Sequence, residues 1–257
     1  MAMVKGLDIF KRHFASFAGH YLLIGGTACD LIMGQAGQVF RATQDLDIVL
    51  CAEAFTDSFV KKFWEFVELG GYSVRERATG KKEFYRFCFP SNTEYPSQLE
   101  LFSRKPDALQ IARGSTLTPL PAGEDALSLS AILLDDEYYQ WILDGKSLIN
   151  GVSVVRAEYL IPLKARAWLD MKSRKDAGEK IDSRKIKKHL NDVLRLFTIL
   201  RRKQVPVVPA AIKGDIDIFL ERIALENVDF KNLRLGRLTM PVVITDLRYI
   251  YNLEDRG

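Results

Sequence analysis

The sequence predicts an α+β fold, in which a mixed sheet flanked by helices is followed by a helical bundle. In residues 1–155, short strand-like and helix-like stretches alternate, and beyond residue 155 apolar residues recur at helical spacing. Of the 257 residues, 47% are hydrophobic and 27% are charged, which is enough apolar material for one large core or two modest ones. We therefore predict two domains, residues 1–155 and residues 156–257.

The elements of the first domain follow from periodicity and turn residues. After a starting helix, we expect strands and helices in alternation at residues 21–24, 27–33, 46–50 and 55–69. Three more strands are expected at residues 72–78, 83–89 and 98–102, and a Thr-Gly-Lys-Lys turn joins the first two as a hairpin. Residues 127–155 are expected to add further short strands, with turns at Asp144-Gly145 and Asn150-Gly151.

The second domain has the pattern of amphipathic helices. One apolar face recurs at the spacing of a single helix, formed by Ile186, Leu190, Val193, Leu194, Phe197 and Leu200. Other helices are expected at residues 157–175, 210–226 and 242–252. These helices predict a small bundle.

Cysteine usage and hydropathy indicate the class of protein. Cys29, Cys51 and Cys88 are odd in number and lie among apolar residues, so we interpret them as reduced core residues. No apolar run approaches the roughly 18 residues of a membrane span, and the first residues lack the order of a signal peptide. We expect a soluble, cytoplasmic protein that does not enter a membrane.

The net charge of +4 is unevenly distributed. Residues 164–203 hold 14 Lys and Arg against 5 Asp and Glu, a local excess of +9. Such a segment attracts phosphate-rich partners, including nucleic acids, but a well-solvated pair of helices would have the same composition.

The first candidate site is the end of the strand at residues 21–24. This apolar strand ends in Gly25 and Gly26, and a helix opens directly at Thr27. Glycine lets the backbone approach a ligand closely, and a helix start offers unpaired N–H groups and the positive end of its dipole. This position suits a phosphate group.

The second candidate site is a pair of carboxylates entering an apolar strand. Arg41 and Thr43 precede Asp45 and Asp47, which are two positions apart and therefore lie on one face of the strand, roughly 7 Å apart. Carboxylates on a half-buried strand need compensation, and a divalent cation would supply it. The alternative is that Asp45 caps a turn and Asp47 merely begins the strand.

Together these motifs resemble those of the DNA polymerase beta-like nucleotidyltransferase superfamily. The Gly-Gly-Thr-Ala start and the Arg-x-Thr-x-Asp-Leu-Asp block are similar to the AbiEii/AbiGii toxin family within it, over residues 21–50. The resemblance implies transfer of a nucleoside monophosphate from a nucleoside triphosphate to an acceptor hydroxyl. It also implies two Mg²⁺ or Mn²⁺ ions at Asp45, Asp47 and a third carboxylate.

The resemblance assigns roles to further residues of the first domain. Glu100 is the best match for the third carboxylate, with Leu99 and Leu101 facing the core, although it could be an ordinary surface residue of a strand. In a two-metal transfer, Glu100 could also accept the proton of the hydroxyl. The triphosphate would be held by Gly25, Gly26, the Thr27 hydroxyl, Arg41 and Thr43, unless Arg41 forms a plain surface salt bridge.

In the second domain, the resemblance indicates a nucleotide-binding lysine and a basic-acidic cluster ending in aspartate. Lys164 fits the lysine, and Lys188-His189-x-x-Asp192 fits the cluster. His189 departs from the acid found in many relatives, and we expect it to be structural. For Asp182 we favour a helix N-cap over a functional acid.

These assignments favour an enzyme that transfers a nucleotide to RNA, for example to a tRNA 3′ end. The resemblance implies that it acts as a toxin of a toxin–antitoxin or abortive-infection system, in which a cognate antitoxin would be its partner. One alternative is transfer to a small molecule or a protein hydroxyl, as in aminoglycoside nucleotidyltransferases. Another is a non-catalytic scaffold that binds nucleic acid or a partner protein. Incubation with a labelled nucleotide distinguishes these three hypotheses, because the label would appear on RNA, on another acceptor or on no acceptor.

Overall fold

The computed structural model describes residues 4–41, 43, 45–50, 56–76, 84–102, 132 and 135–253. Within them, seven strands form one sheet in the order β3-β4-β5-β2-β1-β7-β6. The strands are β1 (Tyr21–Ile24), β2 (Asp45–Leu50), β3 (Ser73–Glu76), β4 (Phe84–Cys88), β5 (Gln98–Phe102), β6 (Lys146–Ile149) and β7 (Val152–Val155). The sheet is mixed, because β2 runs parallel to β5 and β1 parallel to β7, while the other neighbours are antiparallel.

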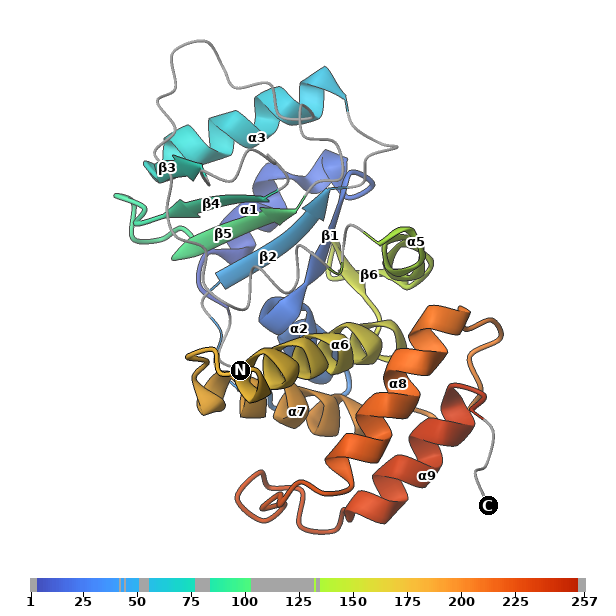
Figure 1. Cartoon of the computed structure of the whole chain (residues 1–257). Helices are drawn as coiled ribbons and strands as arrows, with labels where there is room; N and C mark the ends of the chain where they lie inside the picture. The colour runs from blue at the N-terminus through green and yellow to red at the C-terminus, as the bar shows by residue number, and fades with distance from the viewer. Residues whose placement is uncertain are drawn as a thin grey trace.

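Helices cover the sheet and follow it. They are α1 (Leu7–His13), α2 (Gly25–Gln35), α3 (Asp57–Gly70), α5 (Asp136–Asp144), α6 (Ala157–Asp176), α7 (Ser183–Phe197), α8 (Ala210–Ile223) and α9 (Met240–Ile250). Figure 1 shows α3 above the sheet and α2, α6 and α7 below it, with α8 and α9 at the lower right. A mixed sheet flanked by helices, followed by a helical region, confirms the predicted fold class. The predicted domain boundary falls between β7 and α6.

Most predicted elements are present with small shifts at their ends. The strands predicted at residues 21–24 and 98–102 have these bounds, and the predicted helices of the second half correspond to α6, α7, α8 and α9. The helix predicted at residues 27–33 begins earlier, at Gly25, because β1 passes into α2 without a loop. The strands β3 and β4 pair in antiparallel fashion as a hairpin requires, whereas the Thr-Gly-Lys-Lys turn and Cys51 lie outside the described residues.

The prediction of only short strands in residues 127–155 is wrong for α5. Asp135 caps this helix by accepting hydrogen bonds from the backbone N–H groups of Glu137 and Tyr138. Acidic residues in the first turn also favour a helix start through the dipole. The apolar residues of this stretch therefore bury one helical face instead of alternating along a strand.

The predicted turn at Asn150-Gly151 is confirmed. It joins β6 to β7, and both residues have positive φ angles, 51° for Asn150 and 84° for Gly151. Two consecutive positive φ angles are typical of the two-residue hairpin turns that suit Asn-Gly. After this turn, β7 lies between β6 and β1, and β6 is an edge strand of the described sheet.

An aromatic cluster fixes α1 and α3 against the sheet. The ring centroid of Phe10 in α1 lies 5.1 Å from that of Tyr21 in β1 and 5.6 Å from that of Phe66 in α3. The ring centroid of Phe14, in the turn after α1, lies 5.8 Å from that of Phe59 in α3. Each fully buried aromatic side chain of this kind contributes about 1.5–3 kcal/mol of hydrophobic stabilisation, so the cluster anchors β1 and the helix that follows it.

Helix α6 is the centre of the helical region and contains a proline. Pro162 has no N–H group to donate to the carbonyl of Glu158, which is one turn earlier in α6. The hydroxyl of Tyr251, directly after α9, donates to this carbonyl at 2.7 Å. The last helix thus supplies the hydrogen bond that the proline removes.

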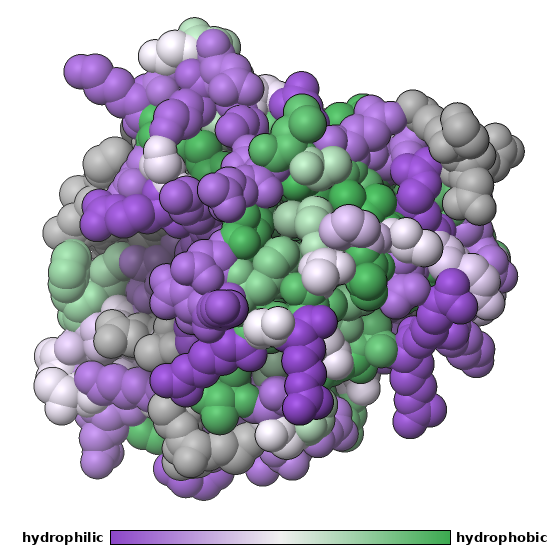
Figure 2. Space-filling model, turned by 90° about the horizontal axis from the view of Figure 1, so that it is seen from below, coloured by the Kyte–Doolittle hydropathy of each residue, from purple (hydrophilic) through white to green (hydrophobic). Residues whose placement is uncertain are grey.

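Among the described residues, no helix is both long and apolar enough to cross a membrane. Figure 2 looks at the molecule from below, where the C-terminal helices of Figure 1 lie, and shows an apolar area bordered by hydrophilic side chains. Large exposed apolar side chains in this part of the chain include Val207, Ile218, Leu225, Val242 and Tyr249.

Candidate functional site

The candidate site begins where β1 passes into α2. Ile24, the last residue of β1, pairs with Asp47 of β2. Gly25 follows with a φ angle of 63°, and a Cβ atom at this position would overlap the carboxylate of Asp47. Only glycine therefore lets the Asp47 carboxylate lie against the first residue of α2, where the helix dipole favours a negative charge.

Gly26 is surrounded by the other residues of the predicted motif. A Cβ atom on Gly26 would lie 2.6 Å from the hydroxyl oxygen of Thr43 and 3.4 Å from Nη2 of Arg41. The structure thus brings Gly25, Gly26, Arg41, Thr43 and Asp47 together at the start of α2. The absence of side chains on the two glycines leaves the backbone N–H groups of the helix start within reach of a ligand.

Two predicted carboxylates face each other across neighbouring strands. Asp47 of β2 is the register partner of Glu100 of β5, and Asp45 is the partner of Gln98. Residues paired in this way lie on the same side of the sheet, on strands about 4.8 Å apart. Glu100 is 7% exposed, whereas Asp45 is exposed and Asp47 half-buried.

The opposite side of both strands is apolar, as predicted. The alternate residues of β2 and β5 are fully or almost fully buried, namely Leu46, Ile48, Leu99 and Leu101. This alternation directs the three carboxylates away from that core.

Gln98 is a site residue that the sequence reasoning missed. Its Nε2 donates a hydrogen bond to Oε1 of Glu100 at 2.8 Å, which holds the buried carboxylate in place. Its position two residues before Glu100, on the same face of a strand, was the available signal.

The three carboxylates have the right chemistry for Mg²⁺ or Mn²⁺, which prefer oxygen ligands. In the described residues, however, no three His, Cys, Asp or Glu side chains lie close enough together to hold a metal ion. Carboxylates repel one another, and a bound cation offsets this repulsion. The donor set and the strand register fit a divalent ion, while a gathered coordination sphere is not present in this structure.

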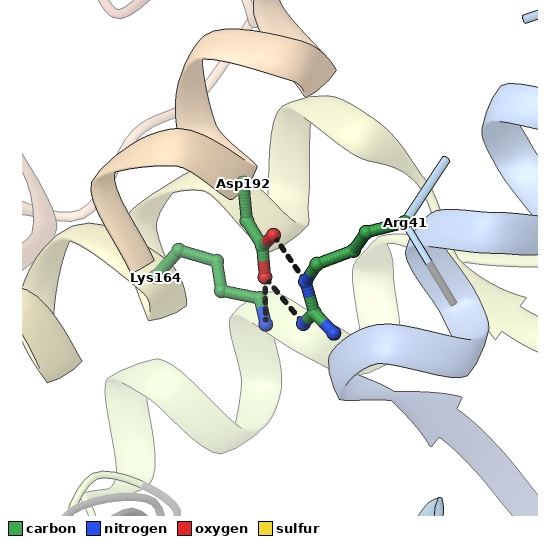
Figure 3. A network of polar contacts seen from close by, with 3 residues as sticks. All are labelled: Arg41, Lys164 and Asp192. Atoms are coloured by element: carbon green, nitrogen blue, oxygen red, sulfur yellow. Dashed lines mark hydrogen bonds and ion pairs between the residues drawn. The ribbon is translucent and has the colours of Figure 1, made fainter. Parts of the chain in front are cut away.

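A network of three charged residues lies beside the glycines and connects the sheet to the helices (Figure 3). Arg41 donates from Nε to Oδ1 of Asp192 and from Nη2 to Oδ2, each at 2.9 Å. Lys164 of α6 donates from Nζ to Oδ2 of Asp192 at 3.2 Å. Asp192 lies on α7, so the network joins α6, α7 and the segment before β2. We call these residues the Arg41–Asp192–Lys164 network.

Burial and charge together set the protonation of this network. The side chains of Asp192, Lys164 and Arg41 are 0%, 7% and 26% exposed. Burial alone would raise the pKa of Asp192, but the charge of Lys164 and the hydrogen bond from Arg41 outweigh it and hold that pKa well below its usual range. Two cations and one anion give the network a net charge of +1, which attracts a phosphate group.

Other predicted site residues have different surroundings. The Thr27 hydroxyl, fully buried, donates to the backbone carbonyl of Asp45 at 2.6 Å, so its proton already has an acceptor. Lys188 is half-buried on α7, one turn before Asp192, and the adjacent His189 is 2% exposed. Asp182 caps α7 by accepting from the N–H of Arg184 at 2.9 Å, which confirms the favoured interpretation.

The described cysteines agree with the sequence interpretation. Cys29 of α2 and Cys88 of β4 are buried and free of disulfides. The pKa of the Cys29 thiol is raised to about 12, because the effect of burial outweighs the opposing effect of the Lys164 charge. Cys29 therefore remains a protonated thiol at neutral pH and is unsuited to act as a nucleophile.

Cavities lined by described residues include one of about 660 Å³ and one of about 530 Å³. Neither includes Asp45, Asp47 or Glu100 in its lining. The larger is lined by residues of α2, β6 and the C-terminal helical region, and the smaller by the C-terminal helical region alone, so the carboxylates and these cavities are separate features.

Comparison with known proteins finds likeness only at the level of structure. No protein-family model and no curated protein matches the chain. A solved nucleotidyltransferase-like antigenic protein from Paracoccidioides brasiliensis aligns at 15% identity and a TM-score of 0.42, covering 90% of this chain and 93% of that one. The antibiotic-resistance factor ANT(2'')-Ia aligns at 14% identity and a TM-score of 0.38, covering 85% and 94%.

A viral enzyme is also similar. The Megavirus polyadenylate synthase aligns at 13% identity and a TM-score of 0.39, with 86% of this chain and 36% of that one covered. All three TM-scores are below 0.5, so the function is argued below from the residues of the chain itself.

Proposed function

We propose that this chain is a metal-dependent nucleotidyltransferase that moves a nucleoside monophosphate from a nucleoside triphosphate to an acceptor hydroxyl. The observation that carries the proposal is the position of the Asp47 carboxylate. It lies against Gly25 at the start of α2, in register with Glu100, and beside a network of net positive charge. A carboxylate face for cations and a helix start for phosphate therefore meet at one point.

Asp45, Asp47 and Glu100 are the residues that would hold Mg²⁺ or Mn²⁺. When bound, such ions neutralise the triphosphate and the leaving pyrophosphate and favour ionisation of the acceptor hydroxyl. The exposed Asp45 and half-buried Asp47 suit ligands that must meet a substrate arriving from solvent. Gln98 would keep Glu100 oriented toward the Asp pair.

The phosphates would be bound by the start of α2 and by the Arg41–Asp192–Lys164 network. Because the Thr27 hydroxyl donates to Asp45, backbone N–H groups at Gly25 and Gly26 take the role first given to that hydroxyl. The Arg41 side chain is partly exposed, and Asp192 fixes its orientation. A planar guanidinium held in this way has the fixed geometry that suits recognition of phosphate oxygens.

In the reaction, the acceptor oxygen forms a bond to the α-phosphorus, and the bond from this phosphorus to the pyrophosphate oxygen breaks. The proton of the acceptor hydroxyl passes to the carboxylate of Glu100, and pyrophosphate leaves. The residues of the chain contribute mainly orientation and electrostatic stabilisation, which dominate phosphoryl-type transfers.

RNA, such as a tRNA 3′ end, is the acceptor we favour. The basic segment of residues 164–203 places exposed cations on and after α7, among them Arg184, Lys187, Arg202 and Lys203. Exposed cations on a helix adjoining the candidate site suit a phosphodiester backbone.

The test is transfer of label from each α-labelled nucleoside triphosphate to total RNA, with Mg²⁺ or Mn²⁺. We expect labelled RNA with the wild-type protein and none with Asp45→Asn/Asp47→Asn. The matched control is Asp8→Asn/Asp57→Asn, which changes two exposed aspartates on α1 and α3. Label that survives ribonuclease identifies a different acceptor, and equal labelling by all three proteins would refute the metal-site assignment.

A further inference from the structure

A half-enclosed cavity of about 660 Å³ lies where the sheet meets the C-terminal helices. Its walls come from the end of α2 (Gln35 and the C-cap residue Ala36), from β6 (Ser147 and Ile149), from the start of α6, and from the segment after α7. A volume of this size is within the range of small-molecule sites. The described residues therefore form a cavity large enough for a small organic ligand.

The lining of this cavity combines an apolar floor with polar groups. The apolar members include Ile32, Ile149, Leu200, Val205 and Ile250. Ser147, Arg201, Lys203 and Gln204 supply donors from two different elements. Apolar surface with a few converging polar groups is the usual composition of a small-molecule site.

The charges around this cavity favour an anion. Three cations and one acid line it, Arg156, Arg201, Lys203 and Glu158, and Glu158 forms an ion pair with Arg156 at 3.5 Å. Arg201 and Lys203 are exposed, and neither side chain has an ion pair or hydrogen bond with any described residue. Within the part of the chain that the structure describes, their charge is therefore uncompensated.

The start of α6 adds to the positive potential. This helix of 20 residues begins in the wall of the cavity at Ala157, and among the described residues no side chain caps its first N–H groups. The positive end of a helix dipole thus lies beside the two cations.

The cavity is distinct from the carboxylate site. The first residues of α2 contact Asp47, whereas the last turn of the same helix lines the cavity. An α-helix of 11 residues is about 16 Å long. A ligand in the cavity would therefore not be the nucleotide whose transfer is proposed above.

We propose that this cavity binds a small organic anion, a phosphate ester or a carboxylate with an apolar body. The apolar part would lie on the floor formed by Ile149, Val205 and their neighbours, and the anionic group would meet Arg201 and Lys203. None of its lining residues belongs to the carboxylate face, and of the four cations named above for the RNA acceptor only Lys203 lines the cavity.

The test uses 8-anilinonaphthalene-1-sulfonate, a fluorescent aromatic anion of suitable size, with the folded full chain. We expect saturable binding, weakened about tenfold by Arg201→Ala/Lys203→Ala, because charge-assisted hydrogen bonds at a partly open site are lost. Ala36→Trp, which fills the cavity from an exposed position, should abolish it. The matched control is Lys180→Ala/Lys187→Ala, which removes two exposed cations outside the cavity and should leave the affinity unchanged.

Competitors then identify the anionic group. Displacement by 1-naphthyl phosphate assigns a phosphate ester, and displacement by 1-naphthoate assigns a carboxylate. The proposal is overturned if neither competitor displaces the probe, if the control pair weakens binding as much as Arg201→Ala/Lys203→Ala, or if neutral N-phenyl-1-naphthylamine binds as tightly. Binding is measured without any nucleotide, so failure of the transfer reaction does not affect the result.

Discussion

Asp192 has no exposed side-chain surface and accepts hydrogen bonds from two cations, Arg41 and Lys164. Its neighbours are also largely removed from solvent, so each charge in the network depends on the others. A buried ion pair contributes little compared with an apolar pair of the same size, but loss of one partner leaves the remaining charge uncompensated. Asp192 is therefore a residue whose removal affects both stability and the orientation of Arg41.

We expect Asp192→Ala to lower the free energy of unfolding by about 3–5 kcal/mol, because Lys164 would remain buried without its counter-charge. Urea denaturation measures this change. Asp176→Ala, which removes an exposed aspartate at the end of α6, is the control and should change the value by less than about 0.5 kcal/mol. A similar, small loss in both variants would contradict the role assigned to the network.

The same carboxylate predicts a pH dependence. Its pKa is lower in the folded chain than in the unfolded chain, so its stabilisation is fully present above the unfolded value of about 3.9 and is lost as the pH falls below it. The difference in unfolding free energy between wild type and Asp192→Asn should shrink by about 1.4 kcal/mol per pH unit below about pH 3.9. Urea titrations at several pH values test this, and a difference independent of pH would exclude a depressed pKa.

Gly25 combines a positive φ angle with the overlap of any Cβ atom with Asp47. Gly25→Ala should destabilise the fold by more than the roughly 1–2 kcal/mol of left-handed strain, and should reduce nucleotide transfer. Gly37→Ala should cost only the left-handed backbone strain, because the φ angle of Gly37 is 71° but no atom lies within 4 Å of the new Cβ. Gly214→Ala, within α8 and without either problem, should stabilise by about 0.5–1 kcal/mol. Thermal unfolding ranks the three, and equal losses at Gly25 and Gly37 would show that Asp47 simply moves aside.

The sequence predicts some residues of the candidate site better than others. Asp47 and Glu100 could be predicted because alternation within a strand decides which face each residue occupies, and both strands are apolar on the other face. The bond between Arg41 and Asp192 could not, because its partners are 151 residues apart and no local pattern relates them. The acceptor of the Thr27 hydroxyl could not be predicted either, because the packing of α2 on β2 determines it.

At the scale of elements, α6 depends on α9. The carbonyl of Glu158 is left without its helical donor by Pro162, and the hydroxyl of Tyr251 replaces that donor. Tyr251 is fully buried, so this is a bond between two elements that water cannot easily substitute.

Tyr251→Phe should lower the free energy of unfolding by about 1–3 kcal/mol, because the carbonyl of Glu158 would be buried without a donor. In the Pro162→Ala background, the restored N–H can donate to that carbonyl, so the same Tyr251→Phe change should cost less. A double-mutant cycle by chemical denaturation measures the coupling between the two positions. A coupling energy of zero would exclude the compensation.

Helix α5 shows why strands were wrongly predicted in this part of the chain. Its sequence contains aromatic residues that are common in strands, among them Tyr138, Tyr139 and Trp141, whereas its helical signal is an Asp135 cap and acids in the first turn. The structure follows the cap, since Tyr138 and Trp141 are then on the same buried face. Cap residues were the better guide here than the composition of the stretch.

The described residues of the sheet and of the helices share one continuous core. Buried apolar residues form a single cluster that extends from Val4 to Tyr251 and includes both the sheet and the helices. Helix α2 packs on β1 and β2 and also contacts α6 and α7. Although the sequence predicts a domain boundary near residue 155, this packing favours cooperative unfolding.

We therefore expect a single unfolding transition in urea. Trp64 of α3 and Trp168 of α6 report on the two predicted domains, and variants that keep only one of them, with the other tryptophans changed to Phe, should unfold with the same midpoint. Each variant needs its own circular dichroism curve as a control for altered stability. Two separated midpoints would show that the sheet and the helices unfold independently.

The 151-residue separation of Arg41 and Asp192 also has a consequence for synthesis of the chain on the ribosome. At about 5–20 residues per second, Asp192 is added about 8–30 s after Arg41. During this interval β1 and the helix start at Gly25 already exist and the other described strands are added, but Arg41 does not yet have the Asp192 carboxylate to orient it. A partly synthesised chain therefore lacks the complete phosphate-binding network, and any activity at this site begins only once α7 has emerged.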